Sequence, residues 1–216
     1  KGTASGVHAF PNAELYMYNS KIQDNSNSSF GAGIYVRQSS KAILVNCLIT
    51  GNVTTSANGG GGLMMYDNCV ADVISCTIAA NGTPGPGGGI FRRQNTNTLR
   101  IFNSVISGNS QRASSSDVDT YEATAAAPVS KNSVLATKAF DSSGTEISAA
   151  IFNPSTMFDA GFHLVGAANP ALQYGMDAAQ LKSLSQTFNH ALGAEVENDI
   201  DGKSRSGKTT MGVWVQ

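Results

Sequence analysis

The sequence of 216 residues predicts an all-β protein, a parallel β-helix of about five coils, and three observations support this. A segment of about 28 residues recurs through roughly the first 140 positions, and such a period is typical of solenoids. Apolar residues alternate within each copy, which is the period of a β-strand. Charged residues make up only 13% of the chain, roughly half the usual share, and 23 residues are glycine. This composition favours a turn-rich β fold over a helical bundle.

Each copy of the repeat opens on a glycine and closes on an asparagine. The closing asparagines follow one another at intervals of 27, 29 and 28 residues, and a degenerate fifth copy places Asn132 29 residues after Asn103. The opening residues are Gly6, Gly33, Gly62 and Gly89, and the closing residues are Asn25, Asn52, Asn81 and Asn109. One such unit buries its apolar side chains only against a neighbouring unit, so the copies are expected to stack in series.

The alternation changes phase once in each copy, which predicts a corner between two strands. In the fourth copy the change falls at Asn103, and the equivalent positions are Asn19, Asn46, Ser75 and Asn132. Asparagine tolerates left-handed backbone, and a stack of asparagines is expected to form a hydrogen-bonded ladder. Three short strands per copy, joined by corners, would then make one coil.

Equivalent apolar residues of successive copies are expected to form continuous inward stacks. One stack is Leu15, Ala42, Ala71 and Leu99; a second is Met17, Leu44, Val73 and Ile101; a third is Ile22, Ile49, Ile78, Ile106 and Leu135. At about 4.8 Å per coil, five coils would make a rod of roughly 24 Å.

The repeat ends near residue 140, and residues 1–139 and 140–216 are expected to form the coils and a capping segment of one domain. The end of a solenoid exposes apolar stacks and strand edges, so a covering segment is expected there. A short helix is predicted from the helical spacing of Leu181, Leu184, Phe188 and Leu192. Asp177 suits the N-cap of this helix and Gly193 its C-terminal stop.

The three cysteines do not show the spacing of a zinc site. Cys47 and Cys76 occupy equivalent positions in adjacent coils, where other copies carry serine, so both are interpreted as small inward residues with free thiols. Cys69 falls in a predicted turn and is interpreted as a bystander.

Residues 202–209 read GKSRSGKT, which matches the phosphate-binding loop pattern G-x-x-x-x-G-K-[ST]. Such a loop needs a buried strand before it and a helix after it. Here the preceding residues EVENDID are acidic, and the following TMGVWVQ reads as a final strand. The pattern is therefore interpreted as a glycine-rich turn, and no nucleotide partner is expected.

The repeat, with GGGIF and LRIFNSVISGN as its clearest copy, resembles the right-handed parallel β-helix proteins exported by bacteria, the broad pectin-lyase-like class. DIDGKSR followed by TMGVWVQ resembles the choice-of-anchor type C-terminus of bacterial surface β-helix proteins. The matching residues are Asp199, Asp201, Gly202, Arg205, Gly212 and Trp214, whereas Thr210 and Gln216 replace acidic residues of that pattern. The resemblance implies a right-handed helix at the surface of a Gram-negative bacterium or outside it. The class includes polysaccharide lyases, glycosidases and adhesins.

A candidate ligand-binding face lies on the strand that follows each opening glycine. By alternation, its outward side chains form a stripe of aromatic residues flanked by arginines, with Met64 in the same face. The candidate glycan-binding residues are His8, Phe10, Tyr35, Arg37, Tyr66, Phe91 and Arg93. Aromatic rings stack on sugars, and arginine binds hydroxyl or acid groups, so the stripe suits a glycan platform unless loops or the C-terminal segment cover it.

Catalytic constellations are harder to find. A glycosidase needs two carboxylates roughly 5–10 Å apart. Asp24, Asp67 and Asp72 alternate poorly with the stripe, and the cluster of Asp117, Asp119 and Glu122 is interpreted as a solvated loop. DIDG lacks the further acidic ligands of a calcium loop. His163 and His190 have no evident serine or cysteine partner.

The leading hypothesis is a non-enzymatic, adhesin-like surface module whose partner is a polysaccharide or surface glycan. The alternatives are a lyase or glycosidase acting on an acidic polysaccharide, and a structural spacer of a longer surface protein. A net charge of −1 and a pI of about 6.3 argue against a nucleic-acid partner. No apolar run approaches the roughly 18 residues that span a bilayer. A monomer without cofactor or metal is expected.

Overall fold

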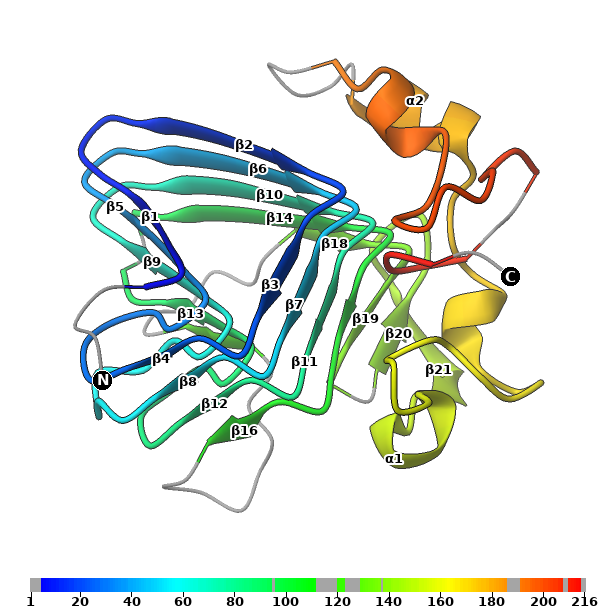
Figure 1. The fold of residues 1–216 in the computed structure, drawn as a ribbon. Helices are drawn as coiled ribbons and strands as arrows, with labels where there is room; N and C mark the ends of the chain where they lie inside the picture. Colours follow the sequence, from blue (N-terminus) through cyan, green and yellow to red (C-terminus); the bar gives the residue numbers. More distant parts are fainter. Residues whose placement is uncertain are drawn as a thin grey trace.

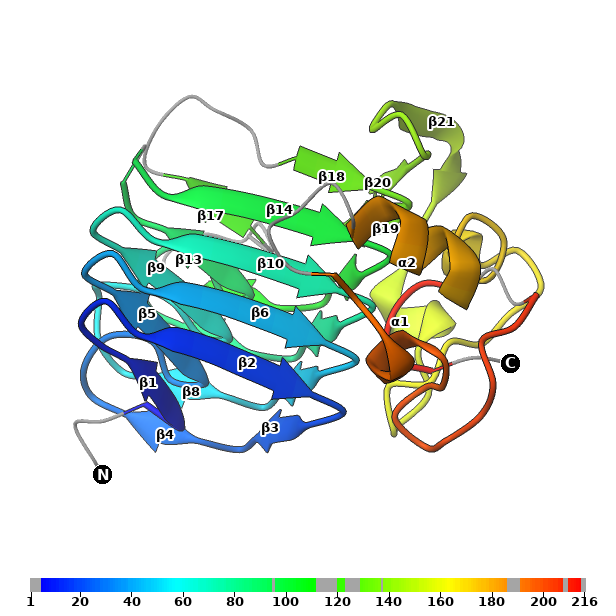
Figure 2. The ribbon, with the colours of Figure 1, turned by 90° about the horizontal axis from the view of Figure 1, so that it is seen from above.

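The computed structural model describes residues 5–94, 96–111, 120–122, 129–136, 138–185, 191–207 and 210–214. The strands stack as coils, and the C-terminal segment lies against one side of the stack (Figures 1 and 2). Within the described residues the coils contribute to four sheets, ordered β1-β5-β9-β13-β17, β2-β6-β10-β14-β18, β3-β7-β11-β15-β19-β20-β21 and β4-β8-β12-β16. We call them the first to fourth sheets. Strands of successive coils pair in parallel, which confirms the predicted parallel β-helix.

The strand bounds follow the repeat. The first coil holds β1 (Val7–Ala9), β2 (Glu14–Tyr18), β3 (Lys21–Gln23) and β4 (Ser26–Asn27). The second holds β5 (Ile34–Arg37), β6 (Lys41–Val45), β7 (Leu48–Thr50) and β8 (Val53–Thr54). The third holds β9 (Leu63–Tyr66), β10 (Val70–Ile74), β11 (Thr77–Ala79) and β12 (Gly82–Thr83). The fourth holds β13 (Ile90–Arg92), β14 (Thr98–Phe102), β15 (Val105–Ile106) and β16 (Ser110–Gln111). The fifth holds β17 (Thr120–Glu122), β18 (Val129–Lys131) and β19 (Ser133–Leu135).

Each of the first four coils therefore has a fourth strand that the sequence did not predict. The strands of the fourth sheet are only two residues long, too short to show an alternation. The other three sheets match the three strands expected per copy. All three inward stacks form as expected, with pairs such as Ala71↔Leu99 and Ile78↔Ile106 in register.

The predicted corner is left-handed in all five copies. The backbone φ angles are 49° at Asn19, 52° at Asn46, 51° at Ser75, 52° at Asn103 and 45° at Asn132. Asparagine side chains bond to neighbouring coils at two places in this column, Asn46 to Asn19 and Asn103 to Ser75. The corner residues thus turn the chain, as their composition predicted.

The continuous asparagine ladder lies elsewhere, at the closing position of each copy. The Nδ2 atoms of Asn25, Asn52 and Asn81 each donate to Oδ1 of the closing asparagine in the next coil, at 2.8, 2.9 and 2.9 Å. The backbone N–H of each donates to the same oxygen. Asn52, Asn81 and Asn109 are fully buried, so the ladder supplies the partners that buried amides require.

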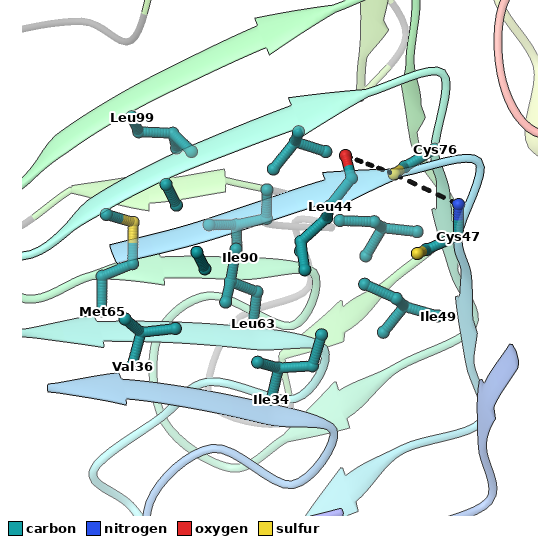
Figure 3. Close-up of a cluster of buried hydrophobic side chains, with 14 of the residues drawn as sticks. Ile34, Val36, Leu44, Cys47, Ile49, Leu63, Met65, Cys76, Ile90 and Leu99 are labelled. Atoms are coloured by element: carbon teal, nitrogen blue, oxygen red, sulfur yellow. Dashed lines mark hydrogen bonds between the residues drawn. The ribbon is translucent and has the colours of Figure 1, made fainter. Parts of the chain in front are cut away.

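The two equivalent cysteines belong to the inward core, as predicted (Figure 3). The Cys47 backbone N–H donates to Sγ of Cys76 at 3.4 Å, and the Cys76 thiol donates to the carbonyl of Leu44. Ser104 Oγ accepts from the Cys76 N–H in the same way. Both thiols are free, and burial raises the pKa of Cys76 well above its ordinary value. Cys69 does lie at a turn, but it is also buried in this core rather than a surface bystander.

The C-terminal segment covers the side of the solenoid more than its end. β20 (Lys138–Phe140) and β21 (Glu146–Ile151) extend the last edge of the third sheet in antiparallel pairing. The part of the C-terminal segment that follows β21 packs beside the corner between the second and third sheets (Figure 2). It contains α1 (Pro154–Met157), η1 (Pro170–Leu172), α2 (Ala178–Ser185) and η2 (Ala194–Val196). Its apolar residues Met176, Leu181, Leu192 and Val196 cover outward residues of the second sheet, chiefly Ile43, Val45, Ile74 and Phe102.

The helix α2 confirms the start of the predicted helix, but residues 191 and 192 are not helical, so Gly193 is not its C-terminal stop. The Asp177 carboxylate accepts from the Gln180 N–H, and the Gln180 side chain accepts from the Asp177 N–H, each at 2.9 Å. This reciprocal pair is a capping box. Leu181 and Leu184 pack on the solenoid, whereas Phe188 and His190 lie outside the described residues.

Arg205 fastens this segment to the column of corner residues. Its side chain is fully buried and donates from Nη2 to Oδ1 of Asn46 at 2.9 Å and to the carbonyl of Gly212 at 2.8 Å. Burial lowers the pKa of Arg205 to about 10, against the opposing effect of the Asp199 carboxylate, so the guanidinium is charged at neutral pH. Asn103 holds the same segment through the Met176 N–H and the Thr210 carbonyl.

This arrangement explains the phosphate-loop pattern. Gly202 is a left-handed turn residue with a φ of 83°, and the side chain of the intervening Arg205 is bonded to the corner residue Asn46. Lys208 and Thr209 lie outside the described residues. The expected final strand does not form at residues 210–214, because Gly212 has a φ of 78° and donates its N–H to the Asn103 carbonyl.

Three turns of the C-terminal segment share one design. Asp141, Asp159 and Asp199 each accept, through Oδ1, the N–H groups two and four residues later. The residue three places after the aspartate is left-handed in each turn. It is Gly144 and Gly202 in two of them, but Phe162, at a φ of 65°, in the third. Left-handed backbone costs a bulky residue roughly 1–2 kcal/mol that glycine avoids.

We expect Asn81→Ala to lower the free energy of unfolding by about 3 kcal/mol or more, because it strips partners from several buried polar groups. These include the Nδ2 and backbone N–H of Asn52 and the Ile49 carbonyl. Urea unfolding followed by circular dichroism measures the loss. Asn25→Ala is the matched control at the half-exposed end of the ladder. Equal losses for the two variants would contradict the role of the buried ladder.

We expect Asn46→Gly to release the C-terminal segment while keeping the left-handed corner accessible. The substitution removes the acceptor of the buried Arg205 charge and the donor to the Glu195 and Asn198 carbonyls. A hydrogen bond to a charged group contributes roughly 1.5–3 kcal/mol, and Asn46 makes one such bond and two bonds to backbone carbonyls. Amide hydrogen exchange should accelerate across residues 195–207 and less across the coils. Asn19→Gly, at the exposed end of the same column, is the control, and uniform acceleration in both variants would refute a local latch.

Candidate functional site

The aromatic stripe forms as predicted on the outer face of the first sheet, which lies away from the C-terminal segment (Figure 1). His8, Tyr35, Met64 and Phe91 are in register across successive coils, and Arg37 is in register with Tyr66. The intervening residues Val36 and Met65 point into the core. We call this set, with Phe10 and Arg93, the aromatic–arginine column.

The centre of the column is buried, contrary to the expectation of an open platform. Tyr35 and Phe91 are each only 4% exposed, and Met64 is fully buried. The cause is the glycine-containing turn that precedes β5, β9 and β13. A Cβ atom added to Gly60 would lie 2.6 Å from the Cβ of Met64, and one added to Gly87 would lie 2.6 Å from the Cβ of Phe91. These turns approach so closely because they lack side chains.

The arginines stack on the rings of the column. The Arg37 guanidinium carbon lies 4.9 Å from the ring centre of Phe10 and 5.7 Å from that of Tyr35. The Arg93 carbon lies 4.8 Å from the ring centre of Tyr66 and 5.4 Å from that of Phe30. These distances are typical of cation–π contacts, which hold each guanidinium in a fixed orientation.

Phe30 is a member of the column that sequence reasoning missed. It comes from the turn before β5, packs on the buried rings and stacks on Tyr35 with ring centres 5.8 Å apart. The other rings were identified from the alternation of residues along strands. Because this alternation does not extend into turns, it could not identify Phe30. Its place beside a glycine-rich run was the available signal.

Burial changes the pKa values and the hydrogen bonding of the polar groups in the column. Partial burial of the His8 ring against Tyr35, with ring centres 4.8 Å apart, lowers the pKa of this otherwise exposed residue, and the Arg37 charge lowers it further. Burial raises the pKa of Tyr35. Its hydroxyl has no hydrogen-bond partner within the described part of the chain, and neither has Nε of Arg37.

The solvent-facing part of the column is therefore its rim. His8 is exposed, Phe10 is 50% exposed, and Arg37, Tyr66 and Arg93 are half-buried. Of the seven predicted ligand-binding residues, these five reach the surface and two do not. The surface offers two cations held on rings, which suits a planar anionic group such as a carboxylate.

The candidate carboxylates do not gather at this rim. Asp72 is buried on the second sheet and paired with Arg100, Nη2 to Oδ2 being 2.8 Å. Asp24 lies at the left-handed corner after β3, and Asp67 at the corner after β9, near enough to raise the pKa of Tyr35. Asp117 and Asp119 lie outside the described residues, as does the side chain of Glu122. Within the described residues, no three histidine, cysteine, aspartate or glutamate side chains lie together in a way that could hold a metal ion.

The stacked coils and their core define the protein as a β-solenoid, in which equivalent outward residues of successive coils lie in register. Comparison with protein families agrees: the model of the right handed beta helix region matches residues 2–134, more than half of the chain. The chain belongs to this right-handed β-helix family. No curated protein and no solved structure matches it. None of the helices in the described residues is long and apolar enough to cross a membrane.

We expect the imidazole of His8 to titrate below the ordinary pKa of 6.5, because burial and the Arg37 charge disfavour its protonated form. A titration by NMR of the His8 ring protons measures this. Arg37→Gln should move the His8 pKa upward, since it removes one of the two causes. The control is Lys138→Gln, on the distant β20, which should leave it unchanged. A His8 pKa at or above 6.5 in the native protein would contradict the described packing.

Proposed function

We propose that this protein is a non-catalytic, exported β-helix module that binds acidic glycans through the rim of the aromatic–arginine column. One observation carries the proposal. Arg37 and Arg93 lie on the same sheet face two coils apart, about 10 Å at the usual strand spacing, and each is stacked on two rings. A row of fixed cations beside apolar rings suits a chain of sugars that carry carboxylates.

The stacking favours binding because it restricts the arginines before a ligand arrives. A free arginine loses rotamer freedom when it binds, whereas one already held between rings loses less. The exposed ring of Phe10 adds a face on which a sugar ring can stack.

An adhesin-like role and a surface location follow from this proposal together with the sequence. The repeated coil pattern and the DIDGKSR and TMGVWVQ segments resemble those of exported bacterial β-helix proteins. In this chain, however, several residues of that C-terminal pattern have structural contacts. Arg205 fastens the segment to Asn46, and the Trp214 indole donates to Asp201 at 2.9 Å. The pattern therefore supports kinship in fold, and the location outside the cell remains part of the proposal.

The rival hypothesis is a lyase or glycosidase on the same face. It needs a second carboxylate beside Asp67 to act on a glycosidic bond. Incubation with oligogalacturonate, followed by chromatography of the products, separates the two hypotheses. Shortened or unsaturated products would replace the binding module with an enzyme.

We expect the native protein to bind an oligogalacturonate more tightly than a cello-oligosaccharide of equal length. The combined change Arg37→Gln and Arg93→Gln should weaken binding of the acidic ligand by at least about tenfold, since each charged hydrogen bond contributes roughly 1.5–3 kcal/mol. Calorimetric titration measures both ligands, and Lys138→Gln is the control for loss of one surface charge. Unchanged affinity in the double variant, with its thermal unfolding also unchanged, would refute the proposal.

A further inference from the structure

A cavity of about 400 Å³ lies at the seam between the coils and the C-terminal segment, away from the aromatic–arginine column. Its floor is the corner after β11 and β15, including Ala80 and Gly108. Its wall is α1 and the turn that follows it, including Pro154, Phe158, Asp159 and Phe162. Figure 1 shows α1 beside this corner. A volume of this size falls within the range of small-molecule sites.

The backbone around the cavity is unusual. Three lining residues are left-handed, with φ angles of 53° at Ala80, 74° at Gly108 and 65° at Phe162. Gly108 lets the wall approach, because a Cβ there would lie 3.1 Å from the Cβ of Pro154. Phe162 occupies the position that glycine holds in the two sister turns at Gly144 and Gly202. Phe162 thus has a left-handed backbone at a position where glycine would fit better, and strained positions concentrate at functional sites.

The lining combines ring faces with one charge. Phe158 and Phe162 are both partly exposed, and their rings meet edge to face with centres 5.8 Å apart. Asp159 is the charged residue of the lining. Its side chain is 45% exposed, and its Oδ2 lies 3.0 Å from Nδ1 of the neighbouring His163 ring, so a ligand amine would share this carboxylate with His163. Partial burial opposes ionisation of Asp159, but N–H donors from His163 and Gly161 outweigh it and hold the pKa of the carboxyl below its ordinary value. The cavity therefore presents a carboxylate beside apolar faces, with the Ser155 side chain also in the lining.

We propose that this cavity binds an amino sugar, with Asp159 as the counter-ion of its protonated amine and the rings of Phe158 and Phe162 as its stacking surface. The apolar face of a pyranose packs on aromatic rings, while an ammonium group pairs with a carboxylate. Ser155, which also lines the cavity, brings a hydroxyl that can bond a sugar hydroxyl. The cavity would therefore prefer cationic sugars, whereas the column, with its two arginines, would prefer anionic ones.

This inference does not depend on the proposed function of the column, because the two sites share no residue. The test uses the full chain labelled with ¹⁵N and titrated at pH 6 with the β-1,4-linked dimer of glucosamine. Cellobiose, which has the same shape without the amine, is the matched ligand. We expect amide shifts centred on residues 158–163, with a Kd at least about tenfold lower for the glucosamine dimer.

Two variants locate the binding. Asp159→Asn keeps an oxygen that accepts from Gly161 and His163 but removes the charge, so it should abolish the preference for the glucosamine dimer. Ala160→Trp, at an exposed lining residue, should fill the cavity and abolish binding of both dimers while thermal unfolding stays unchanged. The double variant Arg37→Gln and Arg93→Gln should bind the glucosamine dimer as the native protein does.

Several results would overturn the inference. These are no shifts near residues 158–163 at millimolar glucosamine dimer, equal affinity for cellobiose, or undiminished binding in Ala160→Trp. Shifts confined to residues of the column would also overturn it, since they would assign the sugar to the other site. Because acidic ligands test the column and basic ligands test the cavity, failure of either proposal is distinguishable from failure of the other.

Discussion

The buried asparagine ladder fixes the register of the coils, and the other features of the solenoid depend on that register. A buried carboxamide without partners is costly, and each closing asparagine finds its partners only when the next coil repeats in the same phase. Asn52 and Asn81 each donate both to the next coil and to carbonyls of the preceding one. A slip of one residue would break these bonds and turn the apolar stacks outward. Polar and apolar requirements thus select the same register.

That periodicity is why much of the fold could be predicted from the sequence. The inward stacks, the left-handed corners and the outward phase of His8, Tyr35 and Phe91 all follow from local alternation repeated in each copy. The fourth sheet could not be predicted, because two residues carry no period. The burial of Tyr35 and Phe91 also escaped prediction, since glycines of the preceding turns decide it through close approach. The bond between Asn46 and Arg205 joins residues 159 positions apart and has no local signal.

The aromatic–arginine column shows how packing and recognition share one set of side chains. Its central rings stabilise the outer face of the first sheet, because the turns close over them. Its arginines then stack on the remaining ring faces and keep their charge at the surface. The column is therefore neither an open platform nor a sealed core. The groups available for binding are the guanidinium groups of Arg37 and Arg93, whose positions depend on the rings they stack on. A substitution at a buried ring would therefore change binding by moving an arginine.

A regular solenoid offers ladders of equivalent residues but few concave sites, because every coil presents nearly the same surface. Concavity requires a break in the repeat, and in this chain the C-terminal segment supplies it. That segment packs along the corner asparagines, and Asn46 and Asn103 bond to its backbone. The register of the coils is held by the separate ladder at the closing position. Where its Asp159 turn meets the corner after β11 and β15, two irregular backbones face each other and leave a cavity. At this seam Phe162 takes a left-handed backbone that would suit glycine better, and its ring packs on the Leu48 and Trp214 cluster and also lines the cavity. The contacts of the ring therefore offset the strain of the backbone.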